Sequence, residues 1–100
     1  MCEPVLIRGM GLAGCLLGHA LQARGIPVHI LDAGWSGAAS PKAAGLMNPL
    51  AGRSLNPAPG WGAFHAQAQR SYRRLEQMLE RTFLFERIYW TLFRNPEEAD

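Results

Sequence analysis

Residues 5–14 read VLIRGMGLAG: a short apolar run, a glycine-rich turn and the start of an apolar helical stretch. The apolar run is typical of a strand buried in a parallel sheet. The helical stretch extends to about Arg24, where glycine and proline follow and predict a helix end. A second apolar run, residues 28–31, predicts another strand, which ends at Asp32. This order predicts a βαβ unit of an α/β fold with a parallel sheet.

Three glycines in the turn, Gly9, Gly11 and Gly14, have the spacing of a dinucleotide-binding motif. The spacing alone is weak evidence, because glycine is common in this chain. Its context is stronger, since the turn follows a strand, opens a helix and precedes a second strand that ends on an acid. Asp32 lies 18 residues after Gly14, close to the separation of about 20 residues found in such folds. We therefore predict a Rossmann-like fold that binds FAD or NAD(P).

Each residue of this motif has an expected physical role. Gly9 permits a tight turn, Gly11 lets a pyrophosphate approach the backbone, and Gly14 lets the helix pack closely on the sheet. Gly18, one turn later, is expected to help that packing. The carboxylate of Asp32 would accept hydrogen bonds from a ribose diol and would repel a 2′-phosphate, which argues against NADP. NAD and FAD share their ADP half, so the motif leaves both open.

Composition bounds the remaining possibilities. The chain has 100 residues, of which 48% are hydrophobic and 18% charged, and its net charge of +2 is too small to predict a nucleic-acid partner. No apolar run is long enough for a membrane span, and the acidic start does not resemble a secretory leader, so a cytoplasmic location is expected. We expect Cys2 and Cys15 to be free thiols, and no histidine or cysteine spacing indicates a metal site.

The second half of the chain is less regular in pattern. Glycine and proline exclude a long helix from residues 48–62. Apolar residues at helical spacing predict a helix over residues 63–81, and aromatic and β-branched residues predict a strand over 82–93. Residues 95–98 resemble the opening of another helix, two residues before the chain ends. We take this as a sign of truncation.

Residues 40–49, SPKAAGLMNP, resemble the segment after the second strand in the D-amino-acid oxidase family of FAD-dependent oxidoreductases, which includes glycine and sarcosine oxidases. Together with the glycine turn and Asp32, this segment follows the family's order and spacing over about the first half of the chain. The resemblance implies that FAD is the cofactor. The implied contacts are Gly9, Gly11, Leu12, Ala13 and Gly14 at the pyrophosphate, Asp32 and Ala33 at the adenosine ribose, Ala39, Ser40 and Lys42 along the phosphate and ribityl path, and Ala44, Gly45 and Leu46 near the flavin ring.

The resemblance also implies an activity. Members of the family oxidise an amine or amino acid by hydride transfer to FAD, after which the imine hydrolyses. We expect residues 1–62 to be the first part of the FAD-binding domain, and residues 63–100 to lead toward an incomplete substrate domain. The family's carboxylate-binding arginine would lie beyond residue 100, and Arg53 is only a weak candidate for that contact. No catalytic residue is assigned, and the isolated chain is expected to be marginally stable and to bind FAD weakly.

Two alternatives remain open. An NAD-dependent dehydrogenase would share the sequence features up to Asp32. NAD enzymes often carry aspartate at that position, whereas members of the oxidase family often carry glutamate. A small non-enzymatic module could instead use the arginines of helix 63–81 to bind an acidic partner, although this leaves the glycine turn unexplained.

Overall fold

The computed structural model of the protein describes residues 3–51, 56–90 and 92–99. The chain forms two compact units, Met1–Leu46 and Met47–Asp100, and each is described separately below. The domain limits expected from the sequence, 1–62 and 63–100, remain predictions.

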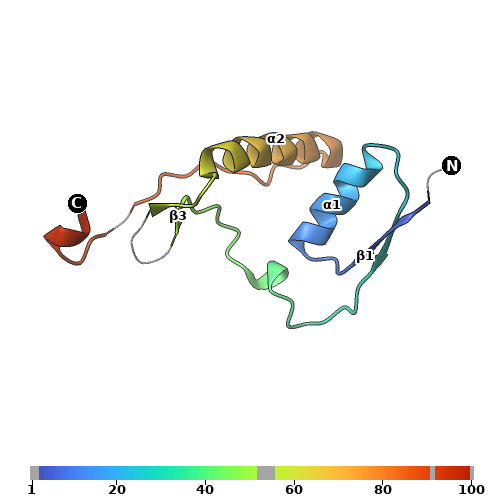
Figure 1. The fold of residues 1–100 in the computed structure, drawn as a ribbon, viewed down its shortest axis with the longest axis horizontal. Coiled ribbons are helices and arrows are strands. Elements are labelled where there is room, and N and C mark those ends of the chain that lie inside the picture. The colour runs from blue at the N-terminus through green and yellow to red at the C-terminus, as the bar shows by residue number, and fades with distance from the viewer. Residues whose placement is uncertain (1–2, 52–55, 91, 100) are drawn as a thin grey trace. The chain divides into compact units, whose positions relative to one another are not determined.

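The first unit is built from two strands and the helix between them. β1 (Val5–Arg8) and β2 (Val28–Leu31) pair in parallel, with Val5 opposite Val28 and Arg8 opposite Leu31. α1 (Leu12–Gln22) connects them and lies beside β1 (Figure 1). The predicted βαβ unit and the α/β, Rossmann-like fold class are confirmed.

The helix covers one face of this small sheet. Ile7 is only 7% exposed, and its side chain and that of Ile30 lie next to Gly18 on α1. Successive residues of a strand point to opposite faces. Leu6 and Leu31, on the other face, are about 60% exposed, at 62% and 60% respectively. The apolar core of the unit is therefore one-sided.

α1 ends at Gln22, two residues before the end near Arg24 that the sequence predicts. The backbone N–H of Ile26 donates to the carbonyl of Leu21, and Gly25 adopts a left-handed conformation with φ +73°. The guanidinium of Arg24 donates to the carbonyl of Ala20 at 3.0 Å. These contacts satisfy carbonyls of the last turn, which have no partner within the helix.

The alanine-rich segment after β2 is mostly irregular. Its regular element is one short 3₁₀ turn, η1 (Ser40–Lys42). Proline at the second position of η1 favours this local turn.

The second unit begins with a hairpin that the sequence did not predict. β3 (Leu50–Ala51) and β4 (Asn56–Pro57) pair antiparallel, with Leu50 opposite Pro57. As expected, this proline-rich region contains no long helix among its described residues.

The predicted helix over 63–81 is confirmed as α2 (Trp61–Leu79), with both ends two residues earlier. Left-handed residues flank it, Gly60 with φ 73° before it and Glu80 with φ 54° after it. The N–H of Glu80 donates to the carbonyl of Glu76 and closes the last turn. At the end of the described chain, the expected helix opening is a 3₁₀ turn, η2 (Pro96–Ala99).

The predicted strand over 82–93 is wrong, because its described residues form no strand. A strand needs a partner for its backbone groups, and Glu76 of α2 takes two of them instead. Its Oε2 accepts hydrogen bonds from the N–H groups of Phe83 and Leu84, at 2.9 and 3.1 Å. Its Oε1 accepts one from Arg73, which also donates to the carbonyl of Leu84. These bonds hold the start of the return segment, which comprises residues 82–90, beside α2.

Two glycines of α1 differ in how closely the chain packs around them. A Cβ at Gly14 would collide with the carbonyl oxygen of Gly9 and lie 3.5 Å from the side chain of Ile7. A Cβ at Gly18 would meet Ile30 at 3.5 Å and Ile7 at 3.8 Å, which are ordinary contacts. The close packing expected of Gly14 is confirmed, whereas Gly18 does not require glycine.

We predict that Gly14→Ala destabilises the protein by about 1–3 kcal/mol, because the added methyl must displace backbone. Gly18→Ala, the matched control, should be neutral or stabilising by up to about 1 kcal/mol, because alanine favours helix. Urea unfolding of both variants measures the difference. Equal effects of the two substitutions would contradict the packing described.

The bonds at Glu76 predict a pH dependence. The N–H of Leu84, the Arg73 guanidinium and the N–H of Phe83 hold the pKa of the Glu76 carboxyl below its ordinary value of 4.5. Because folding lowers this pKa, the charged carboxylate stabilises the folded state at pH values above 4.5. This contribution is lost as the pH falls through the lowered pKa. We expect Glu76→Gln to lower the protection of the Phe83 and Leu84 amides against hydrogen exchange at neutral pH. Glu80→Gln, which removes a carboxylate four residues away, should leave that protection unchanged.

Candidate functional site

The glycine turn forms a sharp corner between β1 and α1. Gly9 has φ +99°, a left-handed conformation that favours glycine. Its N–H donates to the carbonyl of Leu31 at 2.7 Å, so the corner begins where the strand pairing ends. Gly11 is extended, with φ −76° and ψ −168°, and α1 starts at the next residue. The turn predicted at Gly9 is confirmed, while Gly11 needs no special backbone conformation.

Asp32 connects the end of β2 to this corner. Its Oδ2 accepts a hydrogen bond from the N–H of Met10 at 2.6 Å, and its Oδ1 accepts one from the N–H of Gly34 at 2.7 Å. These two bonds, that from Met10 more than that from Gly34, hold the pKa of the Asp32 carboxyl below its ordinary value of 3.8. The structure therefore brings a charged carboxylate next to the glycine corner, as the motif predicts.

Ser40 reaches the same corner from η1. Its Oγ accepts a hydrogen bond from the N–H of Leu12, the first residue of α1, at 3.0 Å. A Cβ on Gly11 would lie 3.2 Å from this oxygen, so the absence of a side chain at Gly11 makes room for Ser40. From the sequence, we expected only a pyrophosphate to occupy the space beside Gly11. Sequence reasoning missed this contact because residues 12 and 40 are far apart in the chain.

Other N–H groups at the start of α1 remain available. No described residue accepts a hydrogen bond from the N–H of Ala13 or Gly14. No acidic side chain lies in the first turn of the helix. Free N–H groups and the positive end of the helix dipole favour an anion. The corner can therefore accept a phosphate at these two donors.

The remaining sequence-predicted residues lie along the segment that follows Asp32. Ala33 lies between Asp32 and Gly34, and Ala39 caps η1, which ends at Lys42. Further on are Ala44, Gly45 with φ +70°, and Leu46, which is 77% exposed. No hydrogen bond between described residues joins Ala44, Gly45 or Leu46 to the corner. Of the residues predicted after β2, the structure therefore joins Asp32 and Ser40 to the corner by hydrogen bonds, but not these three.

The contact between Asp32 and Gly34 could have been predicted from the sequence. Asp32-Ala33-Gly34 forms a turn in which the aspartate side chain accepts from the N–H two residues on, a common use of aspartate in turns. Gly34 is left-handed, with φ +66°. This pattern could have identified Gly34 as the residue that orients Asp32.

Other sequence expectations concern thiols, metals and membranes. Cys15 is a free cysteine, as predicted, whereas Cys2 and Arg53 lie outside the described residues. Within the described part of the chain, no group of three potential ligands could hold a metal ion. Across residues 3–51, 56–90 and 92–99, no helix has the length and hydropathy needed to cross a membrane.

We predict that Asp32→Ala loosens the corner even without a ligand, because the N–H groups of Met10 and Gly34 lose their acceptor. Faster hydrogen exchange at these two amides would show it. The contribution of Asp32 to the protection of these amides should be complete at pH values above its ordinary pKa. It should disappear as the pH falls through the lowered pKa. Unchanged exchange at both amides would contradict this role.

Comparison with known proteins assigns the chain to a family. A protein-family model described as FAD dependent oxidoreductase (DAO) matches residues 4–100. No curated protein and no solved structure matches the chain.

Proposed function

The chain belongs to the DAO family of FAD-dependent oxidoreductases, and from this we propose that it binds the ADP half of FAD at the corner between β1 and α1. We further propose that the substrate is an amine or amino acid, oxidised at its C–N bond. Flavin-dependent oxidoreduction follows from the family, and the choice of substrate follows from the resemblance of residues 40–49 to amino-acid oxidases.

The observation that carries the proposal is the position of Asp32 at the corner. Each carboxylate oxygen accepts one backbone N–H and keeps a lone pair for another donor. The two hydroxyls of a ribose could use these lone pairs. The carboxylate is already charged and oriented before a ligand arrives, so little ordering would be needed on binding.

The phosphates would meet donors from two sources. The N–H groups of Ala13 and Gly14 provide the first. Ser40 provides the second, because its Oγ accepts from Leu12 and its own O–H proton is left to donate. Lys42, two residues on, would add a positive charge near this path.

FAD, when bound, would supply the hydride acceptor, and the protein would supply binding and orientation. We propose that Ala33 and Ala39 line the cofactor path and that Ala44, Gly45 and Leu46 approach the flavin ring. The small side chains and the left-handed Gly45 support close approach to the backbone of this segment.

The first test is the cofactor itself. We expect the purified protein to bind added FAD, weakly, and not NADH, as measured by the change in the absorbance spectrum of the added flavin. A colourless protein that binds NADH would instead favour the NAD-dependent dehydrogenase.

The second test is binding to the corner. Asp32→Ala should weaken FAD binding by about 1.5–3 kcal/mol, the range for a hydrogen bond to a charged group. Asp32→Asn keeps one acceptor oxygen and should lose less. Titration of the apoprotein with FAD, followed by flavin fluorescence, measures both. Equal affinity in the wild type and both variants would remove Asp32 from the site.

A further inference from the structure

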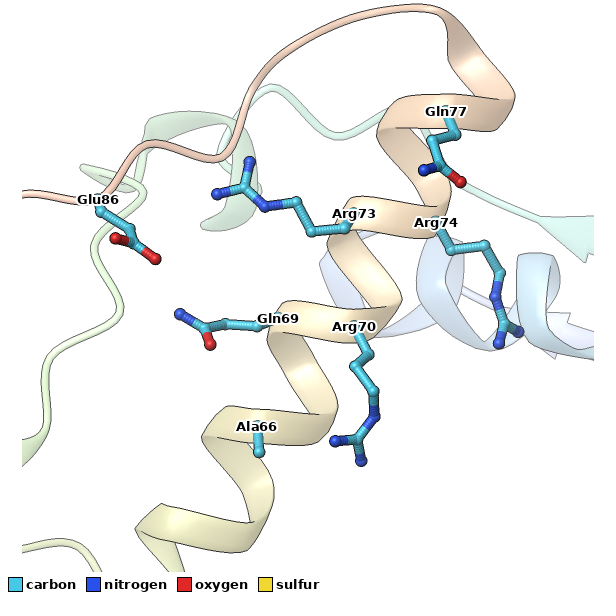
Figure 2. A pocket seen from close by; sticks show the side chains of 7 residues that line it. All are labelled: Ala66, Gln69, Arg70, Arg73, Arg74, Gln77 and Glu86. Carbon is cyan, nitrogen blue, oxygen red and sulfur yellow. The ribbon is translucent and has the colours of Figure 1, made fainter.

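The polar side of α2 carries a concentration of positive charge. Residues three and four positions apart lie on one side of a helix. We call the resulting surface the basic face, made of Ala66, Gln69, Arg70, Arg73, Arg74 and Gln77. With Glu86 of the return segment, it lines an open hollow of about 520 Å³ (Figure 2).

The three arginines of the basic face do not have the same surroundings. Arg73 extends toward Glu86 in Figure 2, and its guanidinium is bonded to Glu76 and to the carbonyl of Leu84. Arg70 and Arg74 lie at the other edge of the basic face and extend away from Glu86 (Figure 2). Within the described residues, neither forms a salt bridge or a hydrogen bond.

Two unpaired guanidinium groups one helical turn apart repel each other. An anion between or above them relieves that repulsion, and the planar fork of arginine matches a carboxylate at two N–H groups. The rise from residue 70 to residue 74 is about 6 Å. Alternate residues of an extended chain, which point to the same side, are about 6.6 Å apart.

We propose that the basic face of α2 binds an extended acidic segment of a partner protein, with two carboxylates from alternate residues on Arg70 and Arg74. Gln77, on the next turn, provides an amide that can bond to a peptide group of the segment. This inference does not depend on the proposed cofactor site, because it uses only residues of the second unit.

Other anionic partners fit the surface less well. Nucleic acids need several phosphate contacts and commonly aromatic platforms for single strands, whereas the basic face offers two unpaired arginines and no aromatic side chain. A single small anion would meet only exposed side chains and no backbone N–H group.

The test uses the full chain and a fluorescein-labelled peptide of alternating glutamate and alanine, followed by fluorescence anisotropy. We expect binding that weakens with added salt, and at least tenfold weaker binding for the double variant Arg70→Gln/Arg74→Gln. The double lysine variant at the same positions keeps the charge but loses the fork, so its loss should be several-fold. A glutamine–alanine peptide should not bind.

Arg81→Gln is the control, because Arg81 lies outside the basic face; it removes one positive charge, against two in the double variant. It should change the affinity less than twofold. A loss in this control equal to that of the double variant would overturn the proposal, as would unchanged binding by the double variant. Tighter binding of a single-stranded oligonucleotide of equal charge would overturn the choice of partner.

Discussion

The close approach of α1 to the end of β1 governs the first unit. The carbonyl oxygen of Gly9 occupies the space that a side chain at Gly14 would fill. This contact fixes where the helix starts relative to the strand, and so fixes which N–H groups point out of the corner. The parallel register of β1 and β2, continued by the hydrogen bond from the N–H of Gly9 to the carbonyl of Leu31, determines where Asp32 lies. A small change in backbone spacing would separate the carboxylate from the N–H of Met10.

Around this contact, side chains distant in sequence complete the corner. Asp32 and Ser40 bond to backbone groups 22 and 28 residues away, at Met10 and Leu12. In both bonds a side-chain oxygen accepts from a backbone N–H, so their geometry depends on the identity of the accepting residue and on the path of the chain between the two partners. The corner is thus an assembly of the glycine motif with the segment after β2, rather than a property of the motif alone.

Much of the first unit could be predicted from the sequence. The strand at residues 28–31 was placed to the residue, because apolar β-branched runs bounded by proline and an acid have few other solutions. The position of Asp32 beside the corner followed from parallel pairing. The contact of Ser40 with Leu12 could not be predicted, because a short polar side chain in an irregular segment carries no periodic signal.

The second unit shows where such prediction fails. Aromatic and β-branched residues over 82–93 indicated a strand, yet strand propensity only acts when a partner edge is present. In its place, one glutamate of α2 takes the backbone N–H groups of Phe83 and Leu84. The hairpin of β3 and β4 could not be predicted because its signal is too short: each strand has only two residues, which show no alternation of apolar and polar side chains.

The left-handed conformation of Glu80 has a consequence for how the chain reverses after α2. A residue with a side chain pays about 1–2 kcal/mol in this conformation, which glycine adopts freely. The reversal is therefore imposed on Glu80 by its neighbours: the N–H groups of Glu80 and Arg81 both donate to the carbonyl of Glu76. Evolution toward glycine at this position would relax the bend without altering its direction, which makes it a natural place to gain thermal robustness.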